Sequence, residues 1–374
     1  MMEIDGGASA GGAPARVALD GGASARGASA QGTSARGQLP VVDVSALFGN
    51  NPDAMAATAA EMGKAARAFG FLYVTGHQQS PALFDSVLDA AKRFFAQSTD
   101  EKMRVYIGNS RNHRGYVPEG EEVFAGGAKD AKEAYDSSRD LPADDPDYLA
   151  GNPLLGPNQW PDLPGFRAAV SAYYQATFEL GRILMRGFAL ALGESPDLFA
   201  TYLTRPPSQL RLIHYPYDAA AADRPGLGSH TDYEFFTMLR STAPGLEVMN
   251  ESGVWIDAPP LPDAYAVNIG DMLELWTNGE FVATSHRVRK VREERYSFPL
   301  FFAVDYHTRI APMPRLVRPG SPPRSPLIAG EHLFAQTAQT FTYLRKRLET
   351  GELVLPETSL ALSSFGQQAK LGAM

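Results

Sequence analysis

The spacing of hydrophobic residues changes along the chain, from a helical period in the first half to a two-residue period in the second. Met55, Ala59 and Met62 recur at helical spacing within residues 53–69, which predicts an amphipathic helix. Two alternating, β-branched runs nearby predict short strands. We expect helices at 53–69, 80–97, 163–194 and 331–349, and early strands at 39–44 and 70–75.

From residue 209 onward, short runs of strand-like composition are separated by turn residues. About eight such runs predict a sandwich or jelly roll, so the expected fold class is mainly β with flanking helices. The expected strands are 209–215, 235–240, 246–249, 254–257, 265–269, 272–277, 281–288 and 297–304.

The dipeptide Asn278-Gly279 lies between the runs 272–277 and 281–288 and predicts a hairpin with a type I′ turn. With a two-residue turn, His286 would face the same side of the hairpin as Leu273. The pattern therefore predicts that His286 points into the core.

Two segments lack hydrophobic periodicity. Residues 1–37 repeat Gly, Ala and Ser, which offer little side chain to bury, so we expect a disordered tail. Residues 105–160 are rich in Gly, Asp, Asn and Pro and are expected to form long loops, which often act as lids or binding segments. Within them, 112–116 is expected either to reach a substrate or to form a plain turn.

The 374-residue chain has 34 basic and 42 acidic side chains, a formal net charge of −8. This balance argues against a nucleic-acid-binding domain, which is usually basic. No hydrophobic run reaches the roughly 18 residues that a membrane span needs. The chain has no cysteine, which excludes disulfides and thiolate metal sites. We expect a cytoplasmic protein without nucleic-acid or membrane partners, and the oligomeric state is not predicted.

The candidate metal ligands are His230, Asp232 and His286. His230 and Asp232 are two residues apart, and on a strand such residues share a face. A second histidine from a later strand completes two imidazoles and one carboxylate. This ligand set, with positions left open, is typical of a non-haem Fe(II) centre that activates oxygen. The other histidines have no partner at ligand spacing and are expected to be structural or surface residues: His77, His113, His214, His307 and His332.

The candidate anion-binding residues are Arg295 and Ser297, which would share one face of a strand. Arg295 begins a run, 298–304, that should be buried, and a buried guanidinium needs an anion such as a carboxylate. Tyr215 is either a third member of this site, through its hydroxyl, or a core aromatic residue.

Several ordered motifs resemble the isopenicillin N synthase-like branch of the Fe(II)/2-oxoglutarate-dependent oxygenases, over roughly residues 39–350. The motifs are Gly228-Ser229-His230-Thr231-Asp232, Pro244-Gly245-Leu246-Glu247-Val248, Val267-Asn268-Ile269-Gly270-Asp271, Thr277-Asn278-Gly279, His286-Arg287-Val288 and Arg295-Tyr296-Ser297, with 39–43 and 70–77 near the start.

The resemblance implies a double-stranded β-helix (jelly roll) core with Fe(II) bound by His230, Asp232 and His286. It implies an enzyme that uses 2-oxoglutarate and O2 to hydroxylate, desaturate or cyclise a small molecule of specialised metabolism. Asp232 fills a position that halogenating relatives leave open to halide, so the resemblance argues against halogenation.

The resemblance also implies that the distal carboxylate of 2-oxoglutarate is bound by Arg295 and Ser297, with support from Tyr215. Many plant members have Asn at the position of Ile213, and Ile cannot donate that hydrogen bond. Two alternatives stay open: an isopenicillin N synthase-type oxidase that uses no 2-oxo acid, and a ligand-binding protein on the same fold without turnover. Fragmentation of the co-substrate to ethylene is a minor variant.

The expected organisation is a tail at 1–37 followed by one globular unit, 38–374. Within this unit we expect a helix-rich N-terminal region at 38–205, the jelly-roll catalytic core at 206–315 and a helical extension at 316–374. The substrate pocket is expected to be lined by the 105–135 loops, by Phe236 or Met238, and by strand residues such as Phe302.

Overall fold

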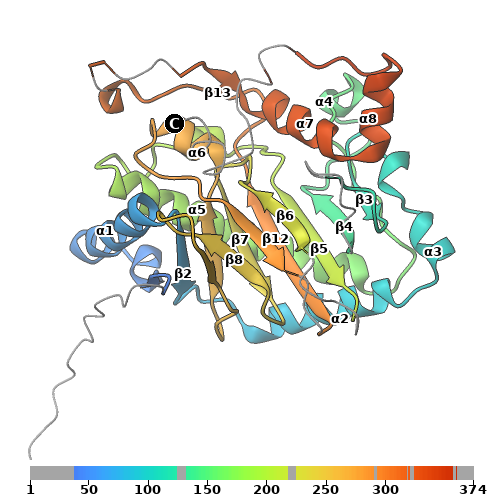
Figure 1. The fold of residues 1–374 in the computed structure, drawn as a ribbon, viewed down its shortest axis with the longest axis horizontal. Helices are drawn as coiled ribbons and strands as arrows, with labels where there is room; N and C mark the ends of the chain where they lie inside the picture. The colour runs from blue at the N-terminus through green and yellow to red at the C-terminus, as the bar shows by residue number, and fades with distance from the viewer. Residues whose placement is uncertain are drawn as a thin grey trace, which may run out of the picture. The chain divides into compact units, whose positions relative to one another are not determined.

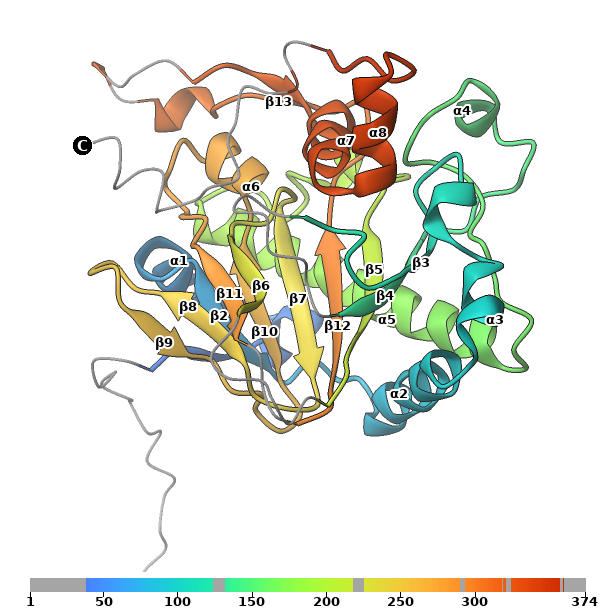
Figure 2. The same cartoon turned by 45° about the vertical axis from the view of Figure 1, so that its right-hand side comes forward.

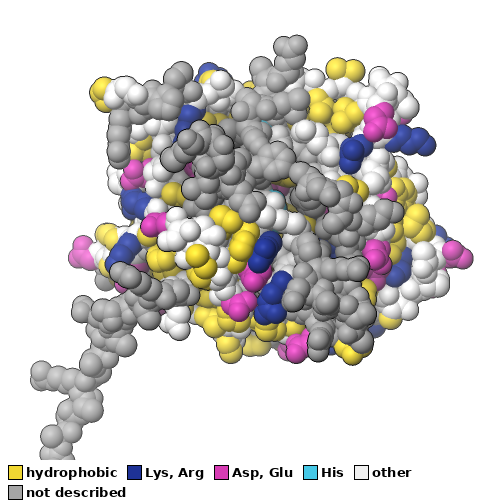
Figure 3. Space-filling model, in the orientation of Figure 1, with side chains coloured by type: hydrophobic (Ala, Val, Ile, Leu, Met, Phe, Trp, Pro, Cys, Tyr) yellow, Lys and Arg dark blue, Asp and Glu magenta, His cyan; other side chains and the backbone are white. Residues whose placement is uncertain are grey.

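The computed structural model describes residues 38–123, 132–217, 225–289, 293–317, 319–320, 324–356 and 359, so the predicted tail at 1–37 lies outside the described residues. No helix among these residues is long and apolar enough to cross a membrane. On the face in Figure 3, basic and acidic side chains lie among one another rather than in a single basic patch. The predicted regions 38–205, 206–315 and 316–374 stay a prediction.

An eight-stranded sheet forms the centre of the fold (Figure 1). Its first two strands are parallel and all other neighbours are antiparallel. In spatial order the strands are β1 (Val41–Asp43), β2 (Phe71–Thr75), β10 (Tyr265–Ile269), β7 (Phe236–Ser241), β12 (Arg295–Phe302), β5 (Gln209–Tyr215), β4 (Glu133–Ser138) and β3 (Gly115–Val117).

A smaller sheet of four strands lies in front of the large one in the view of Figure 1. Its order is β6 (Pro225–His230), β11 (His286–Arg289), β8 (Leu246–Met249) and β9 (Trp255–Asp257). A further pair, β13 (Arg309–Ile310) and β14 (Leu327–Ile328), follows the core. Two sheets packed face to face bury the inward-facing side chains of both, as the alternating pattern predicted.

Three helices cover the large sheet on the side away from the small one: α1 (Pro52–Ala68), α2 (Pro81–Phe95) and α5 (Phe166–Ala191) (Figure 2). Asn51 and Ser80 cap α1 and α2 by accepting backbone hydrogen bonds, and a proline follows each cap at the first helical position. At Gly181, α5 approaches β12 so closely that a Cβ atom would lie 2.3 Å from the ring of Phe302. The α5 side of β12 is therefore packed core.

The predicted helix at 331–349 is two helices, α7 (Ala329–Thr340) and α8 (Thr342–Glu349). Phe341 separates them with extended backbone (φ −87°, ψ 130°) and packs edge-on against His113, with ring centroids 4.5 Å apart. The two helices lie at one end of the strands (Figure 2). Residues of α7 line the cavity between the sheets there.

Two predictions about elements were wrong. Residues 105–160 are not only loops, because β3 and β4 extend the large sheet there and α4 (Pro146–Leu149) follows. The predicted strand 272–277 is α6 (Asp271–Trp276), and most of the predicted strand 281–288 is irregular chain before β11. Asn278 and Gly279 do have the positive φ of a type I′ turn (55° and 83°), but they follow the end of α6, where Gly279 N–H donates to Glu274 O at 2.8 Å.

Candidate metal centre and its cavity

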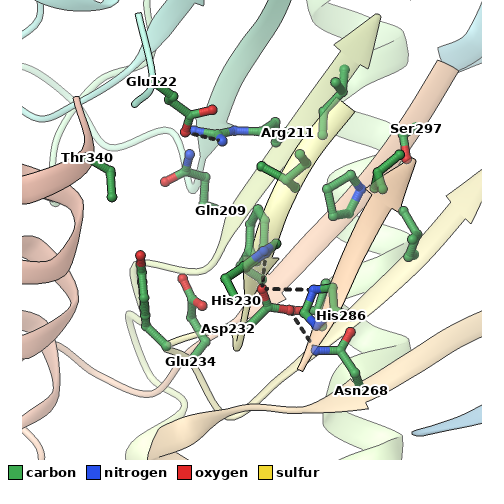
Figure 4. A pocket seen from close by; sticks show the side chains of 18 of the residues that line it. Glu122, Gln209, Arg211, His230, Asp232, Glu234, Asn268, His286, Ser297 and Thr340 are labelled. Atoms are coloured by element: carbon green, nitrogen blue, oxygen red, sulfur yellow. Dashed lines mark hydrogen bonds and ion pairs between the residues drawn. The ribbon is translucent and has the colours of Figure 1, made fainter. Parts of the chain in front are cut away.

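The pairing of β6 with β11 brings the two candidate histidines together, because His230 and His286 are direct partners in the ladder. Their ring centroids are 4.4 Å apart. Asp232 lies just after β6 rather than on it, so the expectation that His230 and Asp232 share a strand was wrong. The short irregular step nevertheless turns the carboxylate toward both rings (Figure 4).

The three side chains form a cluster that could hold a metal ion, with one ligand atom from each and all of these within 4.8 Å of one another. Asp232 Oδ1 lies 3.5 Å from His230 Nε2 and 3.6 Å from His286 Nε2. The Nδ1 atoms lie against the carbonyls of Gly228 (2.8 Å) and Thr284 (3.2 Å). A carbonyl only accepts, so each Nδ1 carries the proton and each Nε2 lone pair is available to a metal.

Asp232 is held from the large sheet through its other oxygen. Oδ2 accepts hydrogen bonds from Asn268 Nδ2 on β10 (2.7 Å) and from Thr237 Oγ1 on β7. Burial favours the neutral acid, but His286, His230 and the amide of Asn268 outweigh it and lower the pKa of Asp232. Burial also lowers the pKa of His286 to about 4, against the opposing effect of Asp232. An ionised carboxylate and a neutral imidazole are the forms that bind metal.

Arg295, at the start of β12, is fully buried. Its Nε donates to Ala243 O at 3.1 Å, whereas Nη1 and Nη2 have no hydrogen-bond partner among the described residues. The guanidinium carbon lies 4.9 Å from the ring centre of Tyr215, its ladder partner on β5. A buried fork with two unpaired nitrogens matches a carboxylate, which accepts two parallel hydrogen bonds.

Ser297, Tyr215 and Ile213 line the same cavity as Arg295 and the metal cluster. Ser297 pairs with Ile213 across β12 and β5, two residues along from the pairing of Arg295 with Tyr215. All six side chains predicted for the site therefore border one cavity. Ile213 offers no hydrogen bond there, as its apolar side chain predicted.

Two family models match the chain: the N-terminal domain of "non-haem dioxygenase in morphine synthesis" over residues 39–163, and the "2OG-Fe(II) oxygenase superfamily" over 206–304. The 2-oxoglutarate-Fe(II) type oxidoreductase hxnY of Emericella nidulans is 32% identical over 79% of this chain and 87% of its own. The chain belongs to the 2OG-Fe(II) oxygenase superfamily.

Other relatives agree with this membership. Homoarginine-6-hydroxylase 2-ODD-C23 of Glycine max is 33% identical over 82% of this chain and 98% of its own. The crystal structure of a full-length Neurospora crassa protein in complex with alpha-KG has a TM-score of 0.70 at 25% identity, covering 80% of this chain and 96% of that one. The predicted jelly-roll fold and the predicted enzyme class, with Fe(II), 2-oxoglutarate and O2 as cofactor and co-substrates, are thereby confirmed.

The cavity of this oxygenase lies between the two sheets and α7. Thr237, Leu239 and Phe301 line it, whereas the predicted lining residues Phe236, Met238 and Phe302 belong to the core on the α5 side. The prediction was wrong by one residue in each strand, and a shift of one residue moves a side chain to the other face.

The cavity wall away from the metal cluster is charged, and sequence reasoning did not anticipate it. Arg211 Nη1 donates to Glu122 Oε1 at 2.6 Å, and its Nε and Nη2 donate to Asp136 at 2.7 and 2.8 Å. Lys132 also binds Glu122. Burial opposes ionisation of Glu122, but Arg211 and Lys132 lower its pKa to about 2.

Two more polar residues border this cavity. Glu234, two residues beyond Asp232, is buried, and burial together with Asp232 raises its pKa to about 8. His113, within the segment 112–116, lines the cavity and binds Tyr343 Oη through Nδ1 at 2.7 Å. The segment 112–116 was predicted either to reach a substrate or to form a plain turn. The position of His113 in the cavity wall favours the first alternative. No motif or spacing in the sequence identified Glu122, Lys132 or Glu234 as residues of the cavity.

Proposed function

We propose that this oxygenase hydroxylates a small polar molecule, with Fe(II) bound by His230, Asp232 and His286 and the distal carboxylate of 2-oxoglutarate bound by Arg295. The observation that carries the proposal is the buried guanidinium of Arg295, whose Nη1 and Nη2 lack hydrogen-bond partners in the described part of the chain. It lines the same cavity as a two-histidine, one-carboxylate cluster. Folding alone does not explain the position of Arg295, because a buried, unpaired cation destabilises the fold.

The residues of the centre fit these groups. The backbone carbonyls of Gly228 and Thr284 fix the two imidazoles with Nε2 toward the shared space, and Asn268 fixes the carboxylate. Three protein ligands leave coordination positions for a chelating 2-oxo acid and for O2. When bound, ferrous iron with 2-oxoglutarate supplies the oxidising power that the side chains lack.

The protein's own contribution is orientation and exclusion of water. Arg295 would fix the far end of 2-oxoglutarate, with Ser297 and Tyr215 as further hydrogen-bond donors beside it. Ile213 and Leu246 surround this part of the cavity with apolar surface, which strengthens the charge pairing by keeping water out. Residues of α7 close the other end of the cavity, where the substrate would bind.

The two competing functions are not favoured. Relatives that cover most of this chain are named as 2-oxoglutarate-dependent enzymes, which disfavours an oxidase without a 2-oxo acid. A binding protein without turnover would not need the metal cluster and the arginine together. We choose hydroxylation over desaturation or ring closure because several relatives are named as hydroxylases. The cytoplasmic location and the lack of nucleic-acid and membrane partners stay predictions.

Replacement of Arg295 tests the proposal. Arg295→Ala is expected to weaken 2-oxoglutarate binding by about 2–5 kcal/mol, because one partner of a buried charge pair is lost. Binding is measured anaerobically, from the visible charge-transfer band that 2-oxoglutarate should give with Fe(II) in this enzyme. Arg309→Ala, which removes an exposed arginine on β13, is the control and should leave the affinity unchanged.

Unchanged affinity in Arg295→Ala would place the anion elsewhere. Substrate oxidation at full rate without 2-oxoglutarate would exclude the proposed reaction in favour of the oxidase.

A further inference from the structure

Glu234 is a buried carboxylate in the wall of the metal-facing cavity. The residue is 6% exposed and borders the cavity. In Figure 4 the carboxyl points into the space that Gln209 and Thr340 also border. Across the described ranges of the chain, no side chain forms an ion pair or a hydrogen bond with it.

The other charges of this wall are already paired. Glu122 binds both Lys132 and Arg211, and Arg211 also binds Asp136. Two acids and two bases thus form a neutral network. Arg295 is the cation that the proposed function assigns to 2-oxoglutarate. Among the described residues, Glu234 is the acid of this wall that forms no ion pair, and Arg211 acts on it only from a distance.

The backbone keeps Glu234 in this position. Its carbonyl oxygen lies so close to Gly270 that a Cβ atom there would be 2.2 Å away. The next residue, Phe235, donates from its N–H to Phe302 O at 3.0 Å and accepts from Gly270 N–H at 2.9 Å. The segment between Asp232 and β7 is therefore fixed to the large sheet, which holds the backbone of Glu234 in place.

We infer that Glu234 recognises the primary substrate by pairing with a guanidinium group, so the substrate class is a guanidine. The inference rests on the proposed function. Such a group would give the buried carboxyl the hydrogen-bonding partner that it lacks among the described side chains, because a guanidinium and a carboxylate match each other with two parallel hydrogen bonds. Gln209 and Thr340 border the same space and offer further hydrogen bonds to the bound molecule.

Matched pairs of ligands test the charge requirement directly. L-homoarginine and L-arginine carry a guanidinium, and L-homocitrulline and L-citrulline carry a neutral urea of nearly the same form. Their affinities are measured by calorimetry with the full-length enzyme, Fe(II) and 2-oxoglutarate, without oxygen. We expect at least one guanidine to bind about 30-fold or more tightly than its urea counterpart, as for one buried charge pair.

Glu234→Gln keeps the size of the side chain and removes the charge, so this variant should lose the preference for the guanidine. Glu251→Gln, at an exposed turn position, is the matched control and should keep the preference. The inference is overturned if no guanidine in the panel binds better than its urea counterpart. A preference that survives in Glu234→Gln overturns it as well.

The charge-transfer band with 2-oxoglutarate separates this inference from the proposed function. If the band forms in wild type and Glu234→Gln alike while the guanidine preference is absent, only the role of Glu234 fails. If the wild-type enzyme binds Fe(II) but gives no band, the proposed function fails first.

Discussion

At the scale of single residues, uncharged side chains set the orientation of the metal-binding carboxylate of Asp232. The carboxylate is oriented by Asn268 and Thr237, which come from two strands of the large sheet. His230 and His286 come from the small sheet. The hydrogen bonds to Asp232 Oδ2 thus fix the carboxylate of the small-sheet ligand cluster to the large sheet.

Asn268→Ala should therefore weaken metal binding by roughly 10–100-fold, as is typical when a partner of a metal ligand is lost. The carboxylate would keep its charge but lose an orienting donor. Titration of the enzyme with Fe(II) without oxygen, or with Mn(II), measures this. Asn158→Ala removes an amide that binds Ser138 O at 2.8 Å outside the cavity, and it should retain wild-type affinity. Equal affinities in both variants would contradict the role given to Asn268.

At the scale of elements, α6 connects the segments that carry the metal ligands. Asp271 N–H donates to Asp232 O at 2.8 Å, and Glu274 Oε2 accepts from Ala283 N–H at 2.6 Å, close to His286. Gly270, the N-cap of α6, lies against the backbone of Glu234. The helix therefore supports both the segment of Asp232 and the segment before His286, a role that the predicted hairpin could not have had.

Gly270→Ala should destabilise the fold by about 1–3 kcal/mol, because the new methyl group would meet backbone, which cannot move aside as a flexible side chain does. Metal affinity should fall with it, since the segment 231–235 must shift. Gly49→Ala is the control, because Gly49 has similar extended backbone and its added Cβ would find its nearest atom at 3.5 Å. Urea unfolding of both variants gives the comparison, and equal losses would contradict the close-contact argument.

At the scale of the whole molecule, buried histidines should make the fold sensitive to mild acid. His332 on α7 is 1% exposed, its Nδ1 lies 3.0 Å from Ser359 O, and burial lowers its pKa below the usual 6.5. The unfolded chain takes up a proton as the pH falls through 6.5, while the folded chain does not. His332 therefore stabilises the fold above that pH, and this contribution is lost as the pH falls through its folded pKa.

Below pH 6.5 the free energy of unfolding of the wild-type protein should decrease as the pH falls. In His332→Gln the slope of this decrease should be smaller, by up to about 1.4 kcal/mol per pH unit. Urea unfolding of the metal-free protein at several pH values between 7 and 5 measures the slope. The exposed His307 provides the control, and His307→Gln should keep the wild-type slope. A slope in His332→Gln equal to that of wild type would show that other groups carry the acid sensitivity.

Much of the fold was readable from local pattern, because burial of one face imposes a period on the residues. The predicted strand 209–215 matches β5, and the helix predicted at 163–194 contains α5. Asn278-Gly279 shows the limit of such patterns. The dipeptide can adopt positive φ both in a hairpin turn and after the end of a helix. The packing around Leu273 and Leu275, which are both fully buried, decides that a helix precedes it.

By itself, the sequence determined the chemistry of the centre: the types and order of His230, Asp232, His286 and Arg295 pointed to a metal and an acidic co-substrate. Only the tertiary structure decided which neutral residues orient the carboxylate and which charges surround the substrate. Glu122, Arg211 and Glu234 come from distant parts of the chain and follow no local period, so no spacing rule could have brought them together. Their proximity is set by how the two sheets and α7 enclose one cavity.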